Sequence, residues 1–523
     1  MATTGVTRLR AKPKRANRSA AMRLQLAPIV AFLVLAGVWE WVGRTHALGG
    51  SIPSMTAVLR AIVDNHQLLL SATWTTTVEA AVGGAIGLAL GVLLAALTAW
   101  FPRSHGHVVR SVVLVNAIPV VAIGPILMSL PARPAIPEVF AALFVLFTTV
   151  ATVGDGFRAP LESGRDLFAV FGAGPVQRFA RLQVPTAVPY VADALRLGIP
   201  AALLGAILGE WFGANSGLGV LMVSAMRNVQ YELLWAACTM AVLVSLLGYC
   251  AGTAAERAAS RFFGRPSTVS AAPVRGSRLV DAGLAILVPV VLVACWQWWV
   301  SAGNVASVVA PSPHEVAVRL WHHGGTFLHA AGETLTTAAV GLAIGTALGL
   351  VLALVSTLFP YVRSLVSPMA VLIPTIPVAV FIPVMGSVLG YGRGAIVASC
   401  VLMTFFPVFV IMVSGLASRP AGSDDLFRVY GANRFVTLAR LALPSSLPSL
   451  FLALRLSAAN CVLTAIAAEW LMDTGGLGRI LSDDQVAIDN ASTWAVAVVA
   501  IVMSVLVYRV AVVGERWGAA RWS

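Results

Sequence analysis

The sequence predicts an all-α integral membrane protein with about twelve transmembrane helices, arranged as two parallel repeats of six helices. Three observations support this fold class: the chain is strongly apolar, stretches long enough to cross a bilayer recur along it, and its second half repeats the first. The mean hydropathy is +0.87, and only 11% of the 523 residues are charged, against about one quarter in soluble globular proteins. Most of the chain is therefore expected to lie in lipid.

Apolar stretches of about 18 to 25 residues, the length that crosses roughly 30 Å of hydrocarbon, recur twelve times. In the first half they lie near 26–43, 75–99, 109–130, 136–153, 190–212 and 233–252. In the second half they lie near 279–300, 334–358, 366–388, 394–413, 448–471 and 494–514. The first stretch has no cleavage site of small residues, so we interpret it as an uncleaved anchor.

The second half of the chain repeats the first at an offset of 258 to 259 residues. The run Ala81-Val82-Gly83 returns as Ala339-Val340-Gly341, and the pair Glu210-Trp211 returns as Glu469-Trp470. Agreement of this extent indicates gene duplication. Because each half has an even number of spans, both should enter the membrane in the same orientation and pack about an axis along the membrane normal.

Arginine placement predicts the orientation, because basic residues near span ends stay on the cytoplasmic side. The tail before the first span is basic and contains no acid, and placing it in the cytoplasm places both termini there. We expect a basic cytoplasmic tail (1–25), a first membrane unit (26–252), a cytoplasmic linker (253–278), a second membrane unit (279–515) and a cytoplasmic tail (516–523). Topology then explains the net charge of +13, and nucleic-acid binding is not expected.

The sequence contains no pattern typical of an enzyme. The only lysines are Lys12 and Lys14, so there is no Gly-Lys-Ser/Thr phosphate loop, and an ATPase driving this protein would be another chain. The five cysteines show no paired spacing, and the histidines, Glu256, Glu315 and Glu333 form no metal or acid-base pattern. No catalytic residue, metal site or cofactor is predicted.

Both halves carry the same polar loop between their fourth and fifth spans. An acidic residue and two apolar residues precede Gly-Ala, and Pro-x-x-x-Pro opens the next span. The first copy contains Asp166, Leu167, Phe168, Gly172, Ala173 and Pro185, and the second contains Asp425, Leu426, Phe427, Gly431, Ala432 and Pro444. We expect helices on both sides of Gly172, with this glycine at a positive φ.

The expected helices of this loop expose an apolar face outside the membrane. It consists of Leu167, Phe168 and Phe171 in the first half and of Leu426, Phe427 and Tyr430 in the second. One interpretation is an amphipathic loop lying on the lipid surface. The repeated glycine and proline spacing favours the other, a docking surface for a partner.

These residues make the chain similar to the permeases of binding-protein-dependent ABC importers. The coupling loop of that family has Glu-Ala-Ala, then glycine, an apolar residue and proline; Gly172, Pro185, Gly431 and Pro444 match, whereas Asp-Leu-Phe replaces the triplet in both halves. Further motifs of this chain resemble those of the nitrate, sulfonate and taurine group of the family. These are the Trp-Glu of the first span, Pro53-Ser54 and Pro311-Ser312, Leu-Arg-Leu in the fifth span, and Glu-Trp followed by Gly-Leu-Gly.

The resemblance implies a type I ABC importer permease fold, with both units supplied by one chain in the cell's inner membrane. It implies two ABC ATPase subunits in trans, an extracytoplasmic solute-binding protein and the lipid bilayer as partners. The ATPases would grip the loops around Gly172 and Gly431 and drive alternating access. The solute would be a sulfonate-, nitrate- or taurine-like anion or a small organic compound.

The alternative is a secondary transporter of the major-facilitator kind, which also has twelve spans in two parallel halves. Against it, the loop near 103–110 lacks the basic signature of that family with its glycine and aspartate. No span carries an inward-facing series of acids for proton coupling either.

Ionisable residues in or near the fifth span of each half are candidates for a role in transport, because charge inside a membrane is costly. Glu210 and Glu469, beside Trp211 and Trp470, either face the pathway or the binding protein, or cap a local turn next to an interfacial tryptophan. Arg196 and Arg455 either extend to lipid headgroups or line an anion route.

The halves differ between their third and fourth spans. The second half has Gly390-Tyr391-Gly392, as in the family, where the first has Pro131-Ala132-Arg133-Pro134. The outer surface is therefore expected to meet its binding protein asymmetrically.

Overall fold

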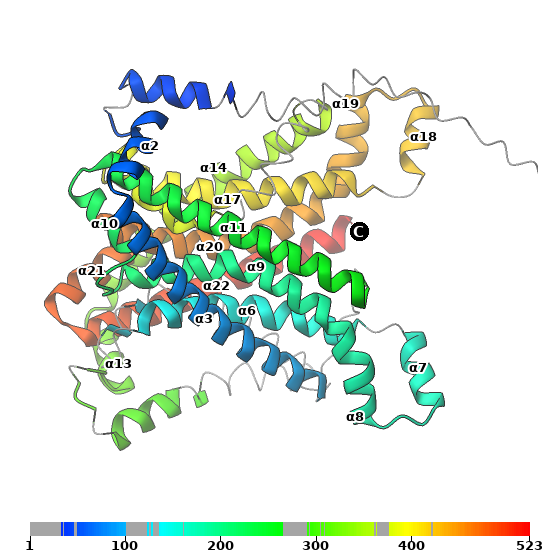
Figure 1. Ribbon diagram of the computed structural model, residues 1–523, viewed down its shortest axis with the longest axis horizontal. Coiled ribbons are helices and arrows are strands. Elements are labelled where there is room, and N and C mark those ends of the chain that lie inside the picture. The colour runs from blue at the N-terminus through cyan, green and yellow to red at the C-terminus, as the bar shows by residue number, and fades with distance from the viewer. Residues whose placement is uncertain are drawn as a thin grey trace, which may run out of the picture.

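The computed structural model describes residues 33–34, 36–46, 50–100, 123–124, 127–128, 135–159, 162–264, 290–291, 293–303, 305–307, 309–359, 362, 376–419 and 422–522. Within these ranges the chain forms helices and turns and contains no strand. The all-α fold class is confirmed. Figure 1 shows an elongated bundle whose long helices run between two ends that carry short helices.

Eight long helices are apolar enough to cross a membrane, four in each half. In the first half they are α3 (His66–Trp100), α6 (Ile136–Arg158), α9 (Val184–Glu210) and α11 (Tyr231–Phe263). In the second half they are α14 (Gly324–Leu358), α17 (Arg393–Ala417), α20 (Leu443–Met472) and α22 (Asn490–Trp522). They match the second, fourth, fifth and sixth expected spans of each half. The expected spans 26–43, 109–130, 279–300 and 366–388 lie partly or largely outside the described residues.

The helices run past the boundaries expected from hydropathy. The sixth span of the first half was expected to end near 252, but α11 continues to Phe263 and ends at Gly264, which takes φ +85°. A helix stops where its backbone is capped, and leaving the hydrocarbon does not by itself stop it. The cytoplasmic linker expected over 253–278 therefore begins as a helix.

The repeated glycines of the second span pack it closely against the fourth. A Cβ on Gly83 or Gly87 would collide with the backbone carbonyl of Glu138 or Ala142 in α6, and one on Gly91 would lie 2.6 Å from Thr149 Cβ. In the second half, a Cβ on Gly345 would lie 2.7 Å from Thr404 Cβ, and one on Gly349 would lie 2.8 Å from the Phe405 carbonyl oxygen, both in α17. Small residues let membrane helices approach closely, which explains why this motif recurs in both halves.

Short helices gather at both ends of the bundle. At one end, on the left of Figure 1, lie α2 (Met55–Asp64), α10 (Leu218–Arg227), α13 (Pro313–His322) and α21 (Gly476–Ala487). At the other lie α7 (Glu162–Val170) with α8 (Pro175–Arg178), and α18 (Ser423–Val429) with α19 (Arg434–Thr437). We call these the α10/α21 end and the α7/α18 end. The α7–α8 pair and the α18–α19 pair stand at opposite corners of their end (Figure 1).

Among the described residues, the buried core shared by the two halves includes the α10/α21 end. One large cluster includes residues of both halves, among them Phe212, Trp470 and Met226. Two smaller clusters lie toward the other end, and each belongs to one half: Phe157 and Ala187 are in one, Phe409 and Ala442 in the other. The described halves are therefore packed together near α10 and α21 and form separate cores near α7 and α18.

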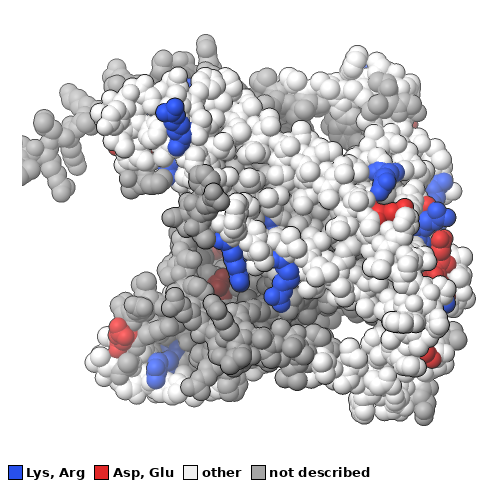
Figure 2. All heavy atoms as spheres, turned by 180° about the vertical axis from the view of Figure 1, so that it is seen from behind, with Lys and Arg blue, Asp and Glu red and all other residues white. Residues whose placement is uncertain are grey.

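Charged residues make up only 11% of the chain. Figure 2 shows that, on the face behind that of Figure 1, charged side chains gather at the α10/α21 end, on the right, and that basic side chains also lie near the middle of the view. Many large apolar side chains on the long helices are exposed, including Leu90, Leu93 and Leu348. Outward-facing apolar side chains along the long helices are expected of a protein in hydrocarbon.

Candidate functional site

The loop between the fourth and fifth spans forms the same helix–turn–helix in both halves. The first helix ends in a turn where Gly172 has φ +64° and Gly431 has φ +69°. The amide of Ala173 donates to the Phe168 carbonyl and that of Ala432 to the Phe427 carbonyl, each at 2.9 Å. This 6→1 bond around a left-handed glycine is the Schellman helix end. The expected positive φ is confirmed for Gly172, and Gly431 takes the same conformation.

Backbone conformation alone requires glycine at the turn. A Cβ on Gly172 or Gly431 would meet no atom within 4 Å, so crowding is not the reason. A non-glycine residue pays a conformational cost in this region of φ, greatest for a β-branched side chain. The turn therefore depends on glycine even though it is open to solvent.

Each turn presents a solvent-exposed apolar surface, which we call the coupling surface. In the first half it comprises Leu167, Val170 and Phe171, which are 55%, 82% and 79% exposed. In the second half it comprises Leu426, Val429 and Tyr430, at 54%, 84% and 82%. Phe168 and Phe427, which were expected to share this surface, are half-buried instead. Val170 and Val429 were missed, although they follow Leu167 and Leu426 at the i+3 spacing that places residues on one helix face.

The spacing from the glycine to Pro185 and to Pro444, which is repeated in the two halves, has a local structural reason. Each proline follows a wide π-turn, Phe179–Gln183 in the first half and Leu438–Ala442 in the second. A proline ring clashes with the carbonyl four residues before it, and an inserted π-turn relieves that clash while the helix continues. The short helices α8 and α19 are thereby joined to the fifth spans α9 and α20 without a break.

The side chains of Arg196 and Arg455 form ion pairs between the fifth and sixth spans. Arg196 lies 3.1 Å from Glu256 on α11 and 2.6 Å from Asp193, and Arg455 lies 2.8 Å from Glu515 on α22. The two arginines therefore have acidic protein partners that neither interpretation from sequence named. Glu256 and Glu515 stand at the repeat offset, and this was the signal that could have revealed the pairs.

Glu210 and Glu469 each tie the end of the fifth span to the short helix that follows. Both side chains are buried, at 1% and 2% exposure. Glu210 accepts hydrogen bonds from the Thr76 hydroxyl at 2.5 Å and from the Gly219 amide. Glu469 accepts from the Thr334 hydroxyl at 2.8 Å and from the Gly478 amide at 3.1 Å.

The threonines complete this arrangement, because Thr76 also accepts from the Leu218 amide and Thr334 from the Leu477 amide. A carboxylate at the first amides of a helix satisfies donors that have no intrahelical partner and interacts favourably with the helix dipole. The geometry thus favours the capping interpretation of Glu210 and Glu469. It also explains the Gly-Leu-Gly motif, because a Cβ on Gly217 or Gly476 would collide with the carboxylate.

Trp211 and Trp470, the neighbours of these carboxylates, meet across the two halves. Their ring centroids are 6.4 Å apart and their planes differ by 11°. The Phe212 ring lies 4.4 Å from that of Trp470. The tryptophans are therefore not separate interfacial anchors but one aromatic contact between the two fifth spans.

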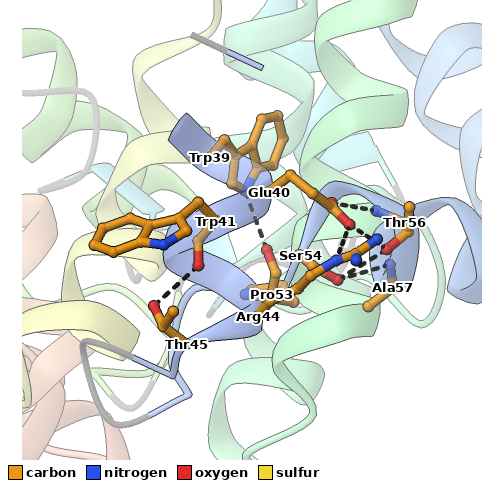
Figure 3. A network of polar contacts seen from close by, with 9 residues as sticks. All are labelled: Trp39, Glu40, Trp41, Arg44, Thr45, Pro53, Ser54, Thr56 and Ala57. Carbon is orange, nitrogen blue, oxygen red and sulfur yellow. Dashed lines mark hydrogen bonds and ion pairs between the residues drawn. The ribbon is translucent and has the colours of Figure 1, made fainter. Parts of the chain in front are cut away.

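The Trp-Glu and Pro-Ser motifs join the end of the first span to a short helix. The Trp39 indole N–H donates to the Pro53 carbonyl at 3.1 Å, and Ser54 caps α2 (Figure 3). Glu40 accepts from the Thr56 amide and hydroxyl and pairs with Arg44 at 2.7 Å. In the second half Trp296 donates to the Pro311 carbonyl, also at 3.1 Å, and Ser312 caps α13.

The halves also meet through the element that the first half lacks. The Tyr391 hydroxyl donates to the Met226 carbonyl at 3.1 Å, so the Gly390-Tyr391-Gly392 turn of the second half contacts α10 of the first. The corresponding Pro131-Ala132-Arg133-Pro134 segment lies outside the described residues.

The comparisons with known proteins agree with this architecture. The family model described as "Binding-protein-dependent transport system inner membrane component" matches residues 87–262 and again residues 345–517. A probable ABC transporter permease protein of Haemophilus influenzae is 30% identical over 226 residues, which are 43% of this chain and 92% of that protein. The formylaminopyrimidine transport permease protein ThiX of Halalkalibacterium halodurans is 30% identical over 232 residues, 43% of this chain and 91% of that protein.

The putative aliphatic sulfonates transport permease protein SsuC of Escherichia coli is 27% identical over 241 residues, 45% of this chain and 88% of that protein. Each relative thus corresponds to about one half of the chain. No solved structure matches the chain. Two matches to one family over most of the sequence exclude the major-facilitator alternative. The chain belongs to the family of binding-protein-dependent transport system inner membrane components, as a multi-pass ABC transporter permease, not itself an enzyme, with two permease units in one polypeptide.

Proposed function

We propose that this chain supplies both halves of the translocation pathway of an ABC importer, driven by two ATPase subunits that bind the two coupling surfaces. The observation that carries the proposal is the repeated, glycine-capped helix pair with exposed apolar residues at one end of the bundle. Exposed apolar side chains of this size outside the hydrocarbon are typical of an interface. One chain with two such surfaces supplies two docking sites.

The separate cores at the α7/α18 end support alternating access. Each coupling surface continues into its own fifth span, so ATP-driven approach of the two ATPase subunits draws the α7/α18 ends together. The halves then part at the α10/α21 end, where a loaded binding protein delivers the solute, and hydrolysis reverses the movement. In this proposal the α7/α18 end and both chain termini lie in the cytoplasm, and the α10/α21 end faces outward.

The proposed solute is a small anion or small organic compound handed over by an extracytoplasmic binding protein. Relatives are described as permeases for aliphatic sulfonates, taurine, riboflavin and formylaminopyrimidine. Titration of the proposed binding protein with taurine, an alkanesulfonate, nitrate and formylaminopyrimidine would choose among these classes.

Replacement of Gly431 by valine tests the coupling assignment. The β-branched residue opposes the positive φ of the turn, so we expect weaker association with the ATPase in affinity purification and lower uptake, with normal membrane insertion. Gly332→Ala is the matched control, because this helical glycine also has nothing within 4 Å of its Cβ position but no positive φ. Unchanged uptake and ATPase association in Gly431→Val would reject the assignment.

A further inference from the structure

The aromatic contact between Trp211 and Trp470 is placed where the two halves must separate. Each indole is only 8% exposed, and the stack lies in the core cluster that both halves share. Two other tryptophan pairs among the described residues, the tilted pair Trp39 with Trp235 and the stacked pair Trp296 with Trp494, each lie within a single half. A contact across the halves breaks when they part, and a contact within one half does not.

We propose that the Trp211–Trp470 stack is the outer gate of the pathway. On opening, the Trp211 side chain moves away and the Trp470 side chain stays in place. This inference rests on the proposed function, which places the α10/α21 end outside. It goes beyond that function by naming the closing residues and by assigning different roles to the two halves.

Hydrogen bonding distinguishes the two tryptophan side chains. The Trp470 indole N–H donates to Gln485 Oε1 at 3.1 Å, and the Gln485 amide lies 2.9 Å from the sulfur of Met128. The Trp211 indole nitrogen is buried and has no hydrogen-bond acceptor among the described residues. A buried donor without a partner is unfavourable in the closed state, so Trp211 loses nothing polar when it leaves.

The sequence repeat explains the difference. Met226 stands at the repeat position of Gln485, and a thioether is a weak acceptor compared with an amide oxygen. Half one therefore lacks the side chain that holds the tryptophan in half two. The asymmetry belongs to this fused chain, since two copies of one unit would carry the same residue at both positions.

The gate is mechanically connected to the outer surface. Glu210 directly precedes Trp211 and accepts a hydrogen bond from the Gly219 amide in the first turn of α10, and Glu469 accepts one from the Gly478 amide in the first turn of α21. A displacement of α10 therefore pulls on Glu210, the residue next to Trp211. A binding protein that docks at this end acts on the gate through α10.

Distances between spin labels test the gate without knowledge of the solute. We would place labels at Ser224→Cys and Asp483→Cys, exposed positions of α10 and α21 related by the repeat, in a chain whose native cysteines are replaced. The sample is the complex of the full chain with its ATPase subunits in nanodiscs. We expect one short distance without nucleotide and an additional longer one after trapping with ATP and vanadate.

Substitutions then exchange the residues that differ beside the two tryptophans, Met226 and Gln485. Met226→Gln gives Trp211 an acceptor and is expected to reduce the ratio of long to short distance by about two- to tenfold, the effect of one hydrogen bond. Gln485→Met releases Trp470 and should raise that ratio by a similar factor. Trp494→Phe, in a stack within one half, is the control and should leave it unchanged.

The outcomes separate this inference from the proposed function. If nucleotide is trapped but the two labels do not separate, or if both exchanges leave the ratio unchanged, the gate assignment is overturned and the importer stands. If Met226→Gln does not fold, Gln485→Met alone decides, because methionine already occupies the equivalent place in the first half. Failure of the chain to bind an ATPase that traps nucleotide would overturn the proposed function itself.

Discussion

Arg455 on the fifth span and Glu515 on the sixth form an ion pair at 2.8 Å, and Arg196 and Glu256 form the same pair at 3.1 Å in the first half. Roughly a quarter of each of these side chains is exposed. The pairs join the fifth span of each half to its sixth span.

Removal of one member of the pair should destabilise the protein more than removal of both. Arg455→Leu leaves Glu515 without its partner in a largely buried place, at an expected cost of about 1–3 kcal/mol. The double variant Arg455→Leu/Glu515→Leu should recover part of that loss. Thermal unfolding in detergent, followed as a double-mutant cycle, measures the coupling. Disruption of Arg479–Asp483, an exposed pair on α21, should cost less than about 0.5 kcal/mol.

The carboxylate cap of α21 should be sensitive to an added methyl group. Gly476 has φ +71°, and a Cβ there would collide with the Glu469 carboxylate. We expect Gly476→Ala to lower stability by more than about 2 kcal/mol, through backbone strain and a displaced cap. Gly392→Ala, where the backbone is extended and the space is open, should be neutral. Equal melting temperatures for the two variants would contradict the capping role.

Loss of the threonine hydroxyl should weaken the same cap without adding volume. Thr334→Val keeps the shape of the side chain but removes the donor to Glu469 and the acceptor for the Leu477 amide. Two buried groups then lose a partner, which should cost about 2–4 kcal/mol. Thr336→Val, an exposed neighbour on the same helix, is the control. The free energy of unfolding in mixed micelles would be compared, and a control that loses as much as Thr334→Val would count against the cap.

Enlargement of a glycine in the contact between α14 and α17 should prevent normal folding. Gly345→Leu places a branched side chain where even a Cβ lies 2.7 Å from Thr404 Cβ. The helices must then move apart. We expect overpacking at such a close helix–helix contact to cost more than about 3 kcal/mol. Fluorescence-detected size-exclusion chromatography should show loss of the monodisperse peak, while Gly332→Leu on the same helix retains it.

A charge on one coupling surface should weaken ATPase docking without affecting the bundle. Val429→Asp places a carboxylate on a side chain that is 84% exposed and makes no core contact. Burial of that charge in an interface is unfavourable, so we expect at least about tenfold weaker ATPase binding with an unchanged melting temperature. Val170→Asp is the equivalent change in the first half. Normal ATPase binding by both variants would show that these surfaces dock nothing.

Much of the fold could be predicted because lipid imposes a strong pattern on the sequence. The eight described spans coincide with apolar stretches, and the positive φ of Gly172 and Gly431 follows from their place between helices. The roles of Glu210 and Arg196 could not be chosen in the same way. For each residue, the same side-chain chemistry fits two interpretations. The partner that decides between them, Thr76 for Glu210 and Glu256 for Arg196, lies far along the chain.

By itself, the sequence determined that the protein is a membrane-embedded duplication with a glycine turn between short helices in each half, because hydropathy, repeat spacing and glycine at a turn are local properties of the chain. Only the tertiary structure decided that Trp211 and Trp470 stack across the halves, that the carboxylates beside them cap helices, and that one tryptophan is held by Gln485 while the other is not. Those facts depend on which side chains face one another after helices pack, and contact across two separate bundles leaves no periodic trace in the sequence.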